Sequence, residues 1–299
     1  MTETDAAAAA APKTAVVVGA RGVIGGNLIA HLEHEGGWQI VGLSRRGGTD
    51  TAATRHIAVD LLDREQTAEK LAALTQTTHI FYAAYQDRPT WAELVPPNLA
   101  MLTNLVDALE PVAPQLEHIS LMQGYKVYGA HLGPFATPAK ESDPPHMPPE
   151  FNVDQQQFLE RRQRGAAWSW SAIRPSVVAG VGLGNPMNLA MVIAIYASMS
   201  KELGVPLRFP GAPGAYTSLT DVMADKADLW QRMIEQHDLE PTPYSDVSSW
   251  PFGDFVFSWD YDVIADTSKS RRAGFHDYVD TEAMFLSIFQ DLRDRRLIP

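Results

Sequence analysis

A glycine-rich turn between two apolar segments constrains the fold of this chain more than any other feature. Residues 14–18 read Thr-Ala-Val-Val-Val, glycines follow at Gly19, Gly22 and Gly25, and an amphipathic stretch opens at Asn27. Glycines let backbone N–H groups approach a ligand closely, and the peptide dipoles at a helix N-terminus favour an anion. The order of strand, turn, helix and second strand predicts a dinucleotide-binding turn, with an ordinary tight turn as the alternative.

The end of the second apolar segment indicates which dinucleotide is bound. This segment ends in Ser44, Arg45 and Arg46, and no Asp or Glu occurs between Gln39 and Gly48. An NAD site usually has a carboxylate here for the ribose hydroxyls, whereas an NADP site needs positive charge for the 2′-phosphate. Two guanidinium groups suit a phosphate because they donate hydrogen bonds in a forked geometry. The pattern favours NADPH, with a solvated basic turn as the alternative.

Short apolar segments and helical patterns then alternate along the chain. The expected strands and helices are 56–60, 64–74, 78–84, 98–109, 116–122, 153–164 and 168–174. This alternation predicts a doubly wound parallel α/β sheet, the Rossmann architecture. Ligands of such sheets bind outside the carboxyl ends of the strands. Those ends comprise Asp60 and Leu61, Ala83 and Ala84, residues 120–126 and residues 174–178.

The remaining segments suggest the domain organisation. Residues 1–13 are acidic and then rich in alanine, so we expect a disordered tail before a dinucleotide-binding region at 14–181. The many prolines of 129–150 predict a loop, either a lid or a surface excursion. Residues 182–299 are mainly helical, with the clearest helix at 187–203, and we expect a substrate-binding region packed as one unit with the first.

Composition narrows the classes of function. The chain of 299 residues has a formal net charge of −12, which disfavours nucleic acid as a ligand. It has no cysteine, and its closest histidine pair, His31 and His34, has no third partner, so no metal site is expected. The apolar run 189–199 is too short to cross a bilayer. We expect a cytoplasmic protein that binds a small molecule and no membrane, and a homodimer stays open.

Further segments strengthen the reading of the glycine turn. They are residues 18–25, 42–46, 78–82, 123–128, 173–175, 185–189 and 207–211. Together they resemble the extended short-chain dehydrogenase/reductases, in particular the branch that contains plant progesterone 5β-reductase and iridoid synthase. The resemblance covers most of residues 14–236, and residues 237–299 fit the branch less well. Members of this branch reduce activated carbon–carbon double bonds, and some also reduce carbonyls, by taking hydride from NADPH.

The resemblance implies which residues contact the cofactor. It places the pyrophosphate at the three glycines, the 2′-phosphate at the two arginines, adenine beside Asp60 and Leu61, and the nicotinamide between Pro175 and Val178. The complete set of expected cofactor contacts is Gly19, Arg21, Gly22, Val23, Ile24, Gly25, Ser44, Arg45, Arg46, Asp60, Leu61, Ala83, Ala84, Lys126, Pro175 and Val178.

Only some of the catalytic residues of this branch have a match in the present sequence. The branch uses a lysine in the loop after the fifth strand and a tyrosine at the start of the next helix, in a pattern like Asn-Phe-Tyr-Tyr-Asp. Lys126 matches the lysine, but residues 150–154 read Glu-Phe-Asn-Val-Asp, so the tyrosine is missing. Tyr125 and Tyr128 are the candidate replacement O–H donors. Asn152 is a candidate amide donor or the cap of the helix that begins near it.

The missing tyrosine bears on the type of reaction. Hydride added to a ketone builds a localised alkoxide that needs a proton at once, whereas hydride added to an enone builds a delocalised enolate that needs mainly a nearby cation or donor. Lys126 can meet the second demand. The sequence therefore favours NADPH-dependent reduction of the C=C bond of a small or medium apolar α,β-unsaturated carbonyl compound. The alternatives are a carbonyl reductase with Tyr128 as donor, and a catalytically silent NADP-binding sensor or scaffold.

Overall fold

The structure is a computed structural model that describes residues 13–184, 187–211 and 218–299. These residues fall into two compact units, of which the first comprises 13–20, 28–122 and 154–173. The second comprises 21–27, 123–153 and the described residues from 174 onward. It thus contains the expected substrate-binding region and additional segments before residue 182. The expected tail at 1–12 lies outside the described residues, and Lys13 already belongs to the first strand.

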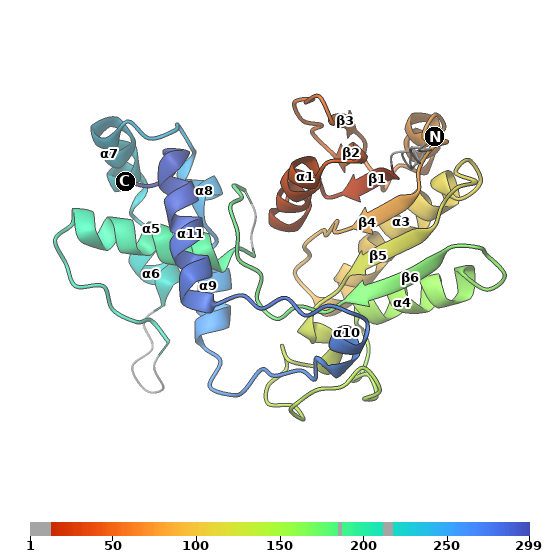
Figure 1. Cartoon of the computed structure of the whole chain (residues 1–299). Coiled ribbons are helices and arrows are strands. Elements are labelled where there is room, and N and C mark those ends of the chain that lie inside the picture. The colour runs from red at the N-terminus through yellow and green to blue at the C-terminus, as the bar shows by residue number, and fades with distance from the viewer. Residues whose placement is uncertain (1–12, 185–186, 212–217) are drawn as a thin grey trace, which may run out of the picture. The chain divides into compact units, whose positions relative to one another are not determined.

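A six-stranded parallel sheet forms the centre of the first unit (Figure 1). The strands lie in the order β3-β2-β1-β4-β5-β6, which is the order of a doubly wound Rossmann sheet. Their bounds are β1 Lys13–Val18, β2 Trp38–Ser44, β3 Thr54–Ala58, β4 His79–Tyr82, β5 His118–Met122 and β6 Ser169–Ile173. The predicted fold class is therefore confirmed.

The alternating direction of the side chains along β1 explains why helices cover both faces of this sheet. Four helices connect the strands, namely α1 Val23–Glu35, α2 Arg64–Leu71, α3 Trp91–Leu109 and α4 Phe151–Arg162. Val16 and Val18 belong to a core that includes side chains of α2, α3 and α4. Ala15 and Val17 belong to a second core with Ile29 and other residues of α1. Because successive side chains of a strand point to opposite faces, a continuous apolar run is what a doubly covered sheet needs.

Helix α3 begins at Trp91, earlier than the expected start at residue 98. Thr90 and Glu93 form a capping box, in which each side chain accepts a hydrogen bond from the backbone N–H of the other. Pro96 and Pro97 lie inside the helix and lack backbone donors, which is why the sequence pattern predicts a later start. The helix continues through both prolines because its first turn is fixed by the box.

The second unit is mainly helical, as expected. A 3-10 helix, η1 Tyr125–Tyr128, follows β5, and the described helices after β6 are α5 Leu189–Glu202, α6 Leu219–Met223, α7 Ala227–His237, α8 Tyr244–Val247, α9 Trp250–Phe257, α10 Ser268–Arg272 and α11 Thr281–Asp294. Its core includes Met191, Ile195 and Met199 of α5 together with Trp230 and Met233 of α7. The apolar side chains of the helix expected at 187–203 therefore serve mainly as core.

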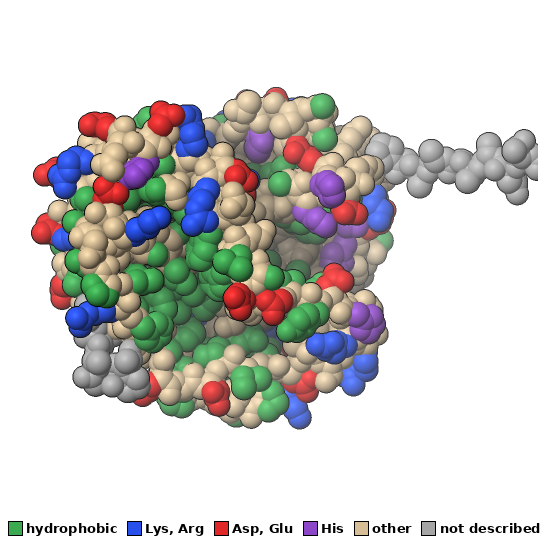
Figure 2. All heavy atoms as spheres, turned by 60° about the vertical axis from the view of Figure 1, so that its left-hand side comes forward, with side chains coloured by type: hydrophobic (Ala, Val, Ile, Leu, Met, Phe, Trp, Pro, Cys, Tyr) green, Lys and Arg blue, Asp and Glu red, His purple; other side chains and the backbone are tan. Residues whose placement is uncertain are grey.

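The surface carries both signs of charge. On the face drawn in Figure 2, acidic and basic side chains are interspersed among uncharged ones. In the described part of the chain, no helix combines the length and the apolar character that a membrane crossing requires.

Candidate functional site

The turn after β1 lies tightly against two strands of the first unit. The N–H groups of Gly19 and Ala20 both donate to the Leu43 carbonyl of β2, at 3.0 and 3.1 Å. Gly19 has a φ of 83°. A β-carbon at this position would lie 2.7 Å from the carbonyl oxygen of Ala83, just after β4. Only glycine satisfies both conditions, so this turn packs closely against the chain after β4.

Two exposed arginines follow β2. The Ser44 hydroxyl donates to the Gly47 carbonyl at 2.8 Å, and Gly47 has a φ of 63°, so the chain turns sharply here. Arg45 and Arg46 are both exposed. Within the described part of the chain, neither guanidinium group forms an ion pair or a side-chain hydrogen bond. Two unpaired cations at the carboxyl end of a strand fit a phosphate group.

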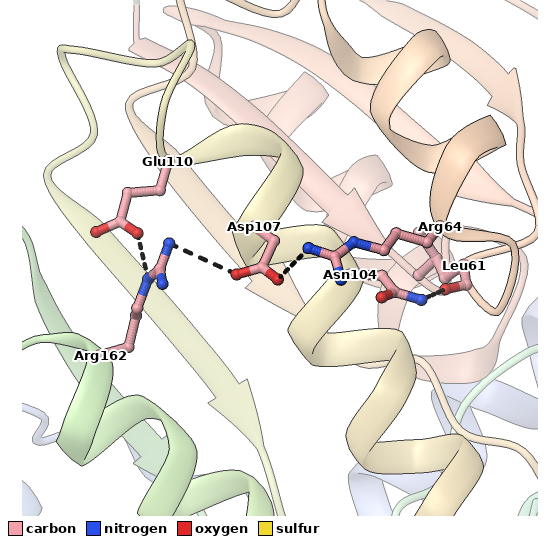
Figure 3. Close-up of polar contacts among 6 residues, drawn as sticks. All are labelled: Leu61, Arg64, Asn104, Asp107, Glu110 and Arg162. Carbon is pink, nitrogen blue, oxygen red and sulfur yellow. Dashed lines mark hydrogen bonds and ion pairs between the residues drawn. The ribbon is translucent and has the colours of Figure 1, made fainter.

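The loop after β3 is anchored by side chains of α2 and α3 (Figure 3). Asn104 of α3 donates to the carbonyl of Leu61 at 2.8 Å. Gln66 of α2 accepts from the N–H of Asp60 at 2.8 Å, and the Asp60 carboxylate accepts from the N–H of Leu62 at 3.1 Å. The two residues expected beside adenine therefore lie on a loop whose backbone is fixed.

An ion-pair chain joins α2, α3 and α4 near this loop (Figure 3). Asp107 of α3 pairs with Arg64 of α2 at 3.4 Å and with Arg162 of α4 at 3.5 Å. Arg162 also pairs with Glu110, which accepts from the indole N–H of Trp168 at 3.0 Å. Exposed pairs of this kind each contribute little to stability.

The expected catalytic side chains of the second unit lie on the 3-10 helix η1. The N–H of Tyr125 donates to the carbonyl of Pro175 at 3.2 Å, so this turn lies beside the segment after β6. Lys126 is half-buried. The rings of Tyr125 and Tyr128 meet edge to face, with centroids 5.7 Å apart. Burial raises the pKa of Tyr125.

The hydroxyl of Tyr128 has a cationic partner. Arg174 donates from Nη1 to the Tyr128 oxygen at 3.2 Å, and its guanidinium carbon lies 5.2 Å from the centre of the ring. Arg174 also donates from Nε to the Gln123 side chain at 2.9 Å. A phenol oxygen that accepts from a cation still has its own proton to donate. From the sequence, residues 120–126 and 174–178 were expected at the sheet edge, but no individual role followed for the side chains of Gln123 and Arg174.

Asn152 lies in the first turn of α4, which begins at Phe151, rather than before it. Glu150 occupies the capping position, because its carboxylate accepts from the N–H of Val153 at 3.2 Å. The expectation that Asn152 caps this helix is therefore wrong. The Asn152 side chain donates to Glu150 at 2.8 Å, and its backbone carbonyl accepts from the Gln123 side chain at 2.8 Å. Burial raises the pKa of Glu150.

The first turn of α1 packs against residues 180–182 within the second unit. Asn27 donates to the Val181 carbonyl at 3.2 Å, and a β-carbon on Gly182 would lie 2.8 Å from a methyl group of Val23. The N–H of Gly26 donates to the Gly22 carbonyl at 2.9 Å and closes the turn. The first turn of α1 and the residues before it therefore lie beside the chain that follows Pro175 and Val178. This segment holds five of the expected cofactor residues, namely Arg21, Gly22, Val23, Ile24 and Gly25.

Sequence reasoning missed a histidine pair in the 129–150 loop. The rings of His131 and His146 meet edge to face, with centroids 5.1 Å apart. Burial, followed by the positive charge of Lys126 and the neighbouring His146, lowers the pKa of His131 to about 4. The described residues contain no group of three or more His, Asp or Glu side chains that could hold a metal ion.

Comparisons with known proteins identify relatives of this chain. A family model described as a PRISE-like Rossmann-fold domain matches residues 56–252. An (S)-8-oxocitronellyl enol synthase from Nepeta racemosa is 27% identical and covers 95% of this chain and 93% of its own length. A 3-oxo-Δ(4,5)-steroid 5β-reductase from Arabidopsis thaliana is 24% identical, with coverage of 95% of this chain and 93% of its own length.

Solved structures resemble the chain in fold. Gre2 from Candida albicans in complex with NADPH has a TM-score of 0.60 at 15% identity and covers 95% of this chain and 99% of its own. UDP-glucose 4-epimerase from Thermotoga maritima, solved with UDP-glucose, has a TM-score of 0.63 at 15% identity and covers 94% of this chain and 99% of its own. Identity at this level supports the fold and carries no information on the substrate.

Proposed function

The chain belongs to the family of PRISE-like Rossmann-fold proteins, and from this premise we propose that it is an NADPH-dependent reductase of activated C=C bonds. Its substrate would be a small or medium apolar α,β-unsaturated carbonyl compound. The name of the Arabidopsis relative supports this reaction class, because it describes a reductase that acts on a 3-oxo steroid with a double bond beside the carbonyl group.

Residues of the first unit would hold the adenosine half of the cofactor. The exposed Arg45 and Arg46 would bind the 2′-phosphate, on a turn that the Ser44 hydroxyl closes by donating to the Gly47 carbonyl. The turn at Gly19 would let the backbone approach the pyrophosphate. Bound NADPH would supply the hydride for the reaction.

The observation that carries the proposal is the placement of Lys126 and Tyr128 on one 3-10 turn directly after β5. A lysine ammonium group can neutralise the oxygen of the enolate that forms when the β-carbon of an enone is reduced. The Tyr128 hydroxyl, whose oxygen accepts from Arg174, would then protonate the α-carbon or the oxygen. Tyr125 is the second candidate donor, and its ring meets that of Tyr128 edge to face.

The test compares Lys126→Ala and Tyr128→Phe with the parent on a panel of enones. As a matched control we choose Lys201→Ala, because Lys201 is an exposed residue of α5. NADPH oxidation is followed by absorbance, and NADPH binding is measured by calorimetry. We expect turnover to fall about 100-fold or more for each site variant, with little change for the control. Undiminished turnover of Lys126→Ala, with NADPH still bound, would reject the assignment.

A second candidate function is carbonyl reduction, and the contact between Arg174 and Tyr128 favours it as well. An alkoxide needs a proton immediately, and a fixed O–H donor supplies one. The identity of the product separates the two reactions, because an enone would give a saturated ketone in the first and an allylic alcohol in the second.

A further inference from the structure

We infer that Arg174 is the positioning residue that fixes the Tyr128 hydroxyl for proton donation. The inference rests on the proposed function, in which Tyr128 supplies a proton. It goes further by assigning a role to a side chain outside the pair that the family resemblance supplies. The support for Arg174 comes from the buried residues Gln123, Asn152 and Glu150, all of which belong to the second unit.

Two contacts of the Arg174 guanidinium group join it to Gln123 and Tyr128. Nε donates to Gln123 Oε1 at 2.9 Å, and Nη1 donates to the Tyr128 oxygen at 3.2 Å. Because the group is planar and rigid, a bond that holds Nε also sets the direction of Nη1. Gln123 therefore determines where Arg174 meets the tyrosine.

Gln123 is itself held in one orientation. It is 7% exposed, and its amide uses both ends, since Oε1 accepts from Arg174 and Nε2 donates to the Asn152 carbonyl at 2.8 Å. Asn152 in turn donates to the buried Glu150 carboxyl at 2.8 Å. Buried polar groups that all have partners form a rigid network, so the position of Arg174 is set by the start of α4.

This arrangement has a direct chemical consequence for Tyr128. A phenol has one proton to donate and an oxygen that accepts, and Arg174 occupies the acceptor side. The proton is therefore directed away from Arg174 and toward a substrate. On transfer the O–H bond breaks, the electron pair stays on the phenolate, and the substrate enolate gains the proton. The cation over the ring stabilises the phenolate until water returns a proton.

The same network gives the altered segment 150–154 a role. In the branch that this chain resembles, the corresponding pattern carries tyrosines, whereas here the Glu150 carboxyl accepts from the Asn152 side chain, and the backbone carbonyl of Asn152 accepts from Gln123. The segment would then act on proton donation indirectly, through Arg174.

The test uses the full chain and two readouts. Arg174→Met removes both hydrogen bonds, and Arg174→Lys keeps the charge without the fork. Arg272→Met, at an exposed arginine of α10, is the matched control. The first readout is a double-mutant cycle with Tyr128→Phe on enone turnover. The second is the ¹³Cζ NMR signal of labelled tyrosine in the protein without substrate, assigned through Tyr128→Phe.

We expect Arg174→Met to lower kcat about 10- to 100-fold with KM for NADPH unchanged, and to have little effect in the Tyr128→Phe background. Arg174→Lys should recover only part of the loss, and both variants should shift the Tyr128 signal, whereas Arg272→Met should not. An unmoved Tyr128 signal, or an equal loss of kcat in the Tyr128→Phe background, would overturn the inference. If the parent reduces no enone but Arg174→Met still shifts the Tyr128 signal, the result would support the contact and reject the proposed function instead. If Arg174→Met fails to fold, Arg174→Lys decides between these outcomes.

Discussion

The carbonyl oxygen of Ala83 lies 2.7 Å from the point that a β-carbon on Gly19 would occupy. The turn after β1 therefore has no room for a side chain, and its φ of 83° also excludes one without strain. We predict that Gly19→Ala lowers the free energy of unfolding by about 1–3 kcal/mol and weakens NADPH binding.

Gly36→Ala is the matched control for this prediction. Gly36 has a φ of 71°, but nothing lies within 4 Å of the point where its β-carbon would be. The Gly36→Ala substitution should lower the free energy of unfolding by about 1 kcal/mol and leave NADPH affinity unchanged. Calorimetric titration and thermal unfolding measure both effects. Equal behaviour of the two variants would show that the Ala83 contact is unimportant.

The two arginines after β2 should decide between the cofactors. We predict that replacing Arg45 and Arg46 together by alanine weakens NADPH binding about 100-fold, because charge-assisted hydrogen bonds to the 2′-phosphate are lost. NADH lacks this phosphate, so its affinity should stay the same. Fluorescence titration with both cofactors measures the change, and Arg161→Ala at an exposed position of α4 is the control. An equal loss for NADH and NADPH would argue against a 2′-phosphate site.

The sheet was predictable from the sequence because its strands are buried on both faces. Val16 and Val17 face different cores, so both must be apolar, and the run stands out. The start of α3 was harder to predict from the sequence, since the capping box at Thr90 is followed by two prolines, which normally end a helix.

The polar part of the site could be predicted only in part. Lys126 and Tyr128 are neighbours in sequence, so a motif can indicate them. The contacts of Gln123 with Asn152 and with Arg174 join residues 29 and 51 positions apart, and no local pattern encodes them. Glu150 was missed as the cap of α4 because glutamate is not among the preferred capping residues.

Tyr82 offers a test of the core that is independent of function. Its side chain is 2% exposed, burial raises the pKa of its hydroxyl, and this hydroxyl has no hydrogen-bond partner among the described residues. An unpaired buried polar group destabilises a fold. We predict that Tyr82→Phe leaves the free energy of unfolding unchanged or raises it by about 1 kcal/mol.

Tyr244→Phe provides the contrast, because the Tyr244 hydroxyl donates to the Met223 carbonyl at 2.6 Å. This variant should lose about 1 kcal/mol, and denaturant unfolding measures both. A larger loss for Tyr82→Phe than for Tyr244→Phe would mean that the Tyr82 hydroxyl has a partner in solution.

The histidine pair predicts a pH dependence of stability. The pKa of His131 is about 4 in the folded chain, below its ordinary value of 6.5. Between these values the unfolded chain binds the proton more readily, so stability is complete above pH 6.5 and falls as the pH drops toward 4. We predict that the free energy of unfolding falls by about 1 kcal/mol less in His131→Gln than in the parent between pH 7 and 5, after allowance for solvent screening. The exposed His34→Gln is the control, and an identical pH profile for both variants would contradict the burial of His131.

The most direct test of the account is the position of hydride transfer. A single turnover with NADPH that carries deuterium at C4 of the nicotinamide and an apolar enone gives a product whose label can be located by NMR and mass spectrometry. We predict a saturated ketone with deuterium on the former β-carbon. Deuterium on the carbinol carbon of an allylic alcohol, or no NADPH oxidation across a broad enone panel despite tight binding, would contradict it.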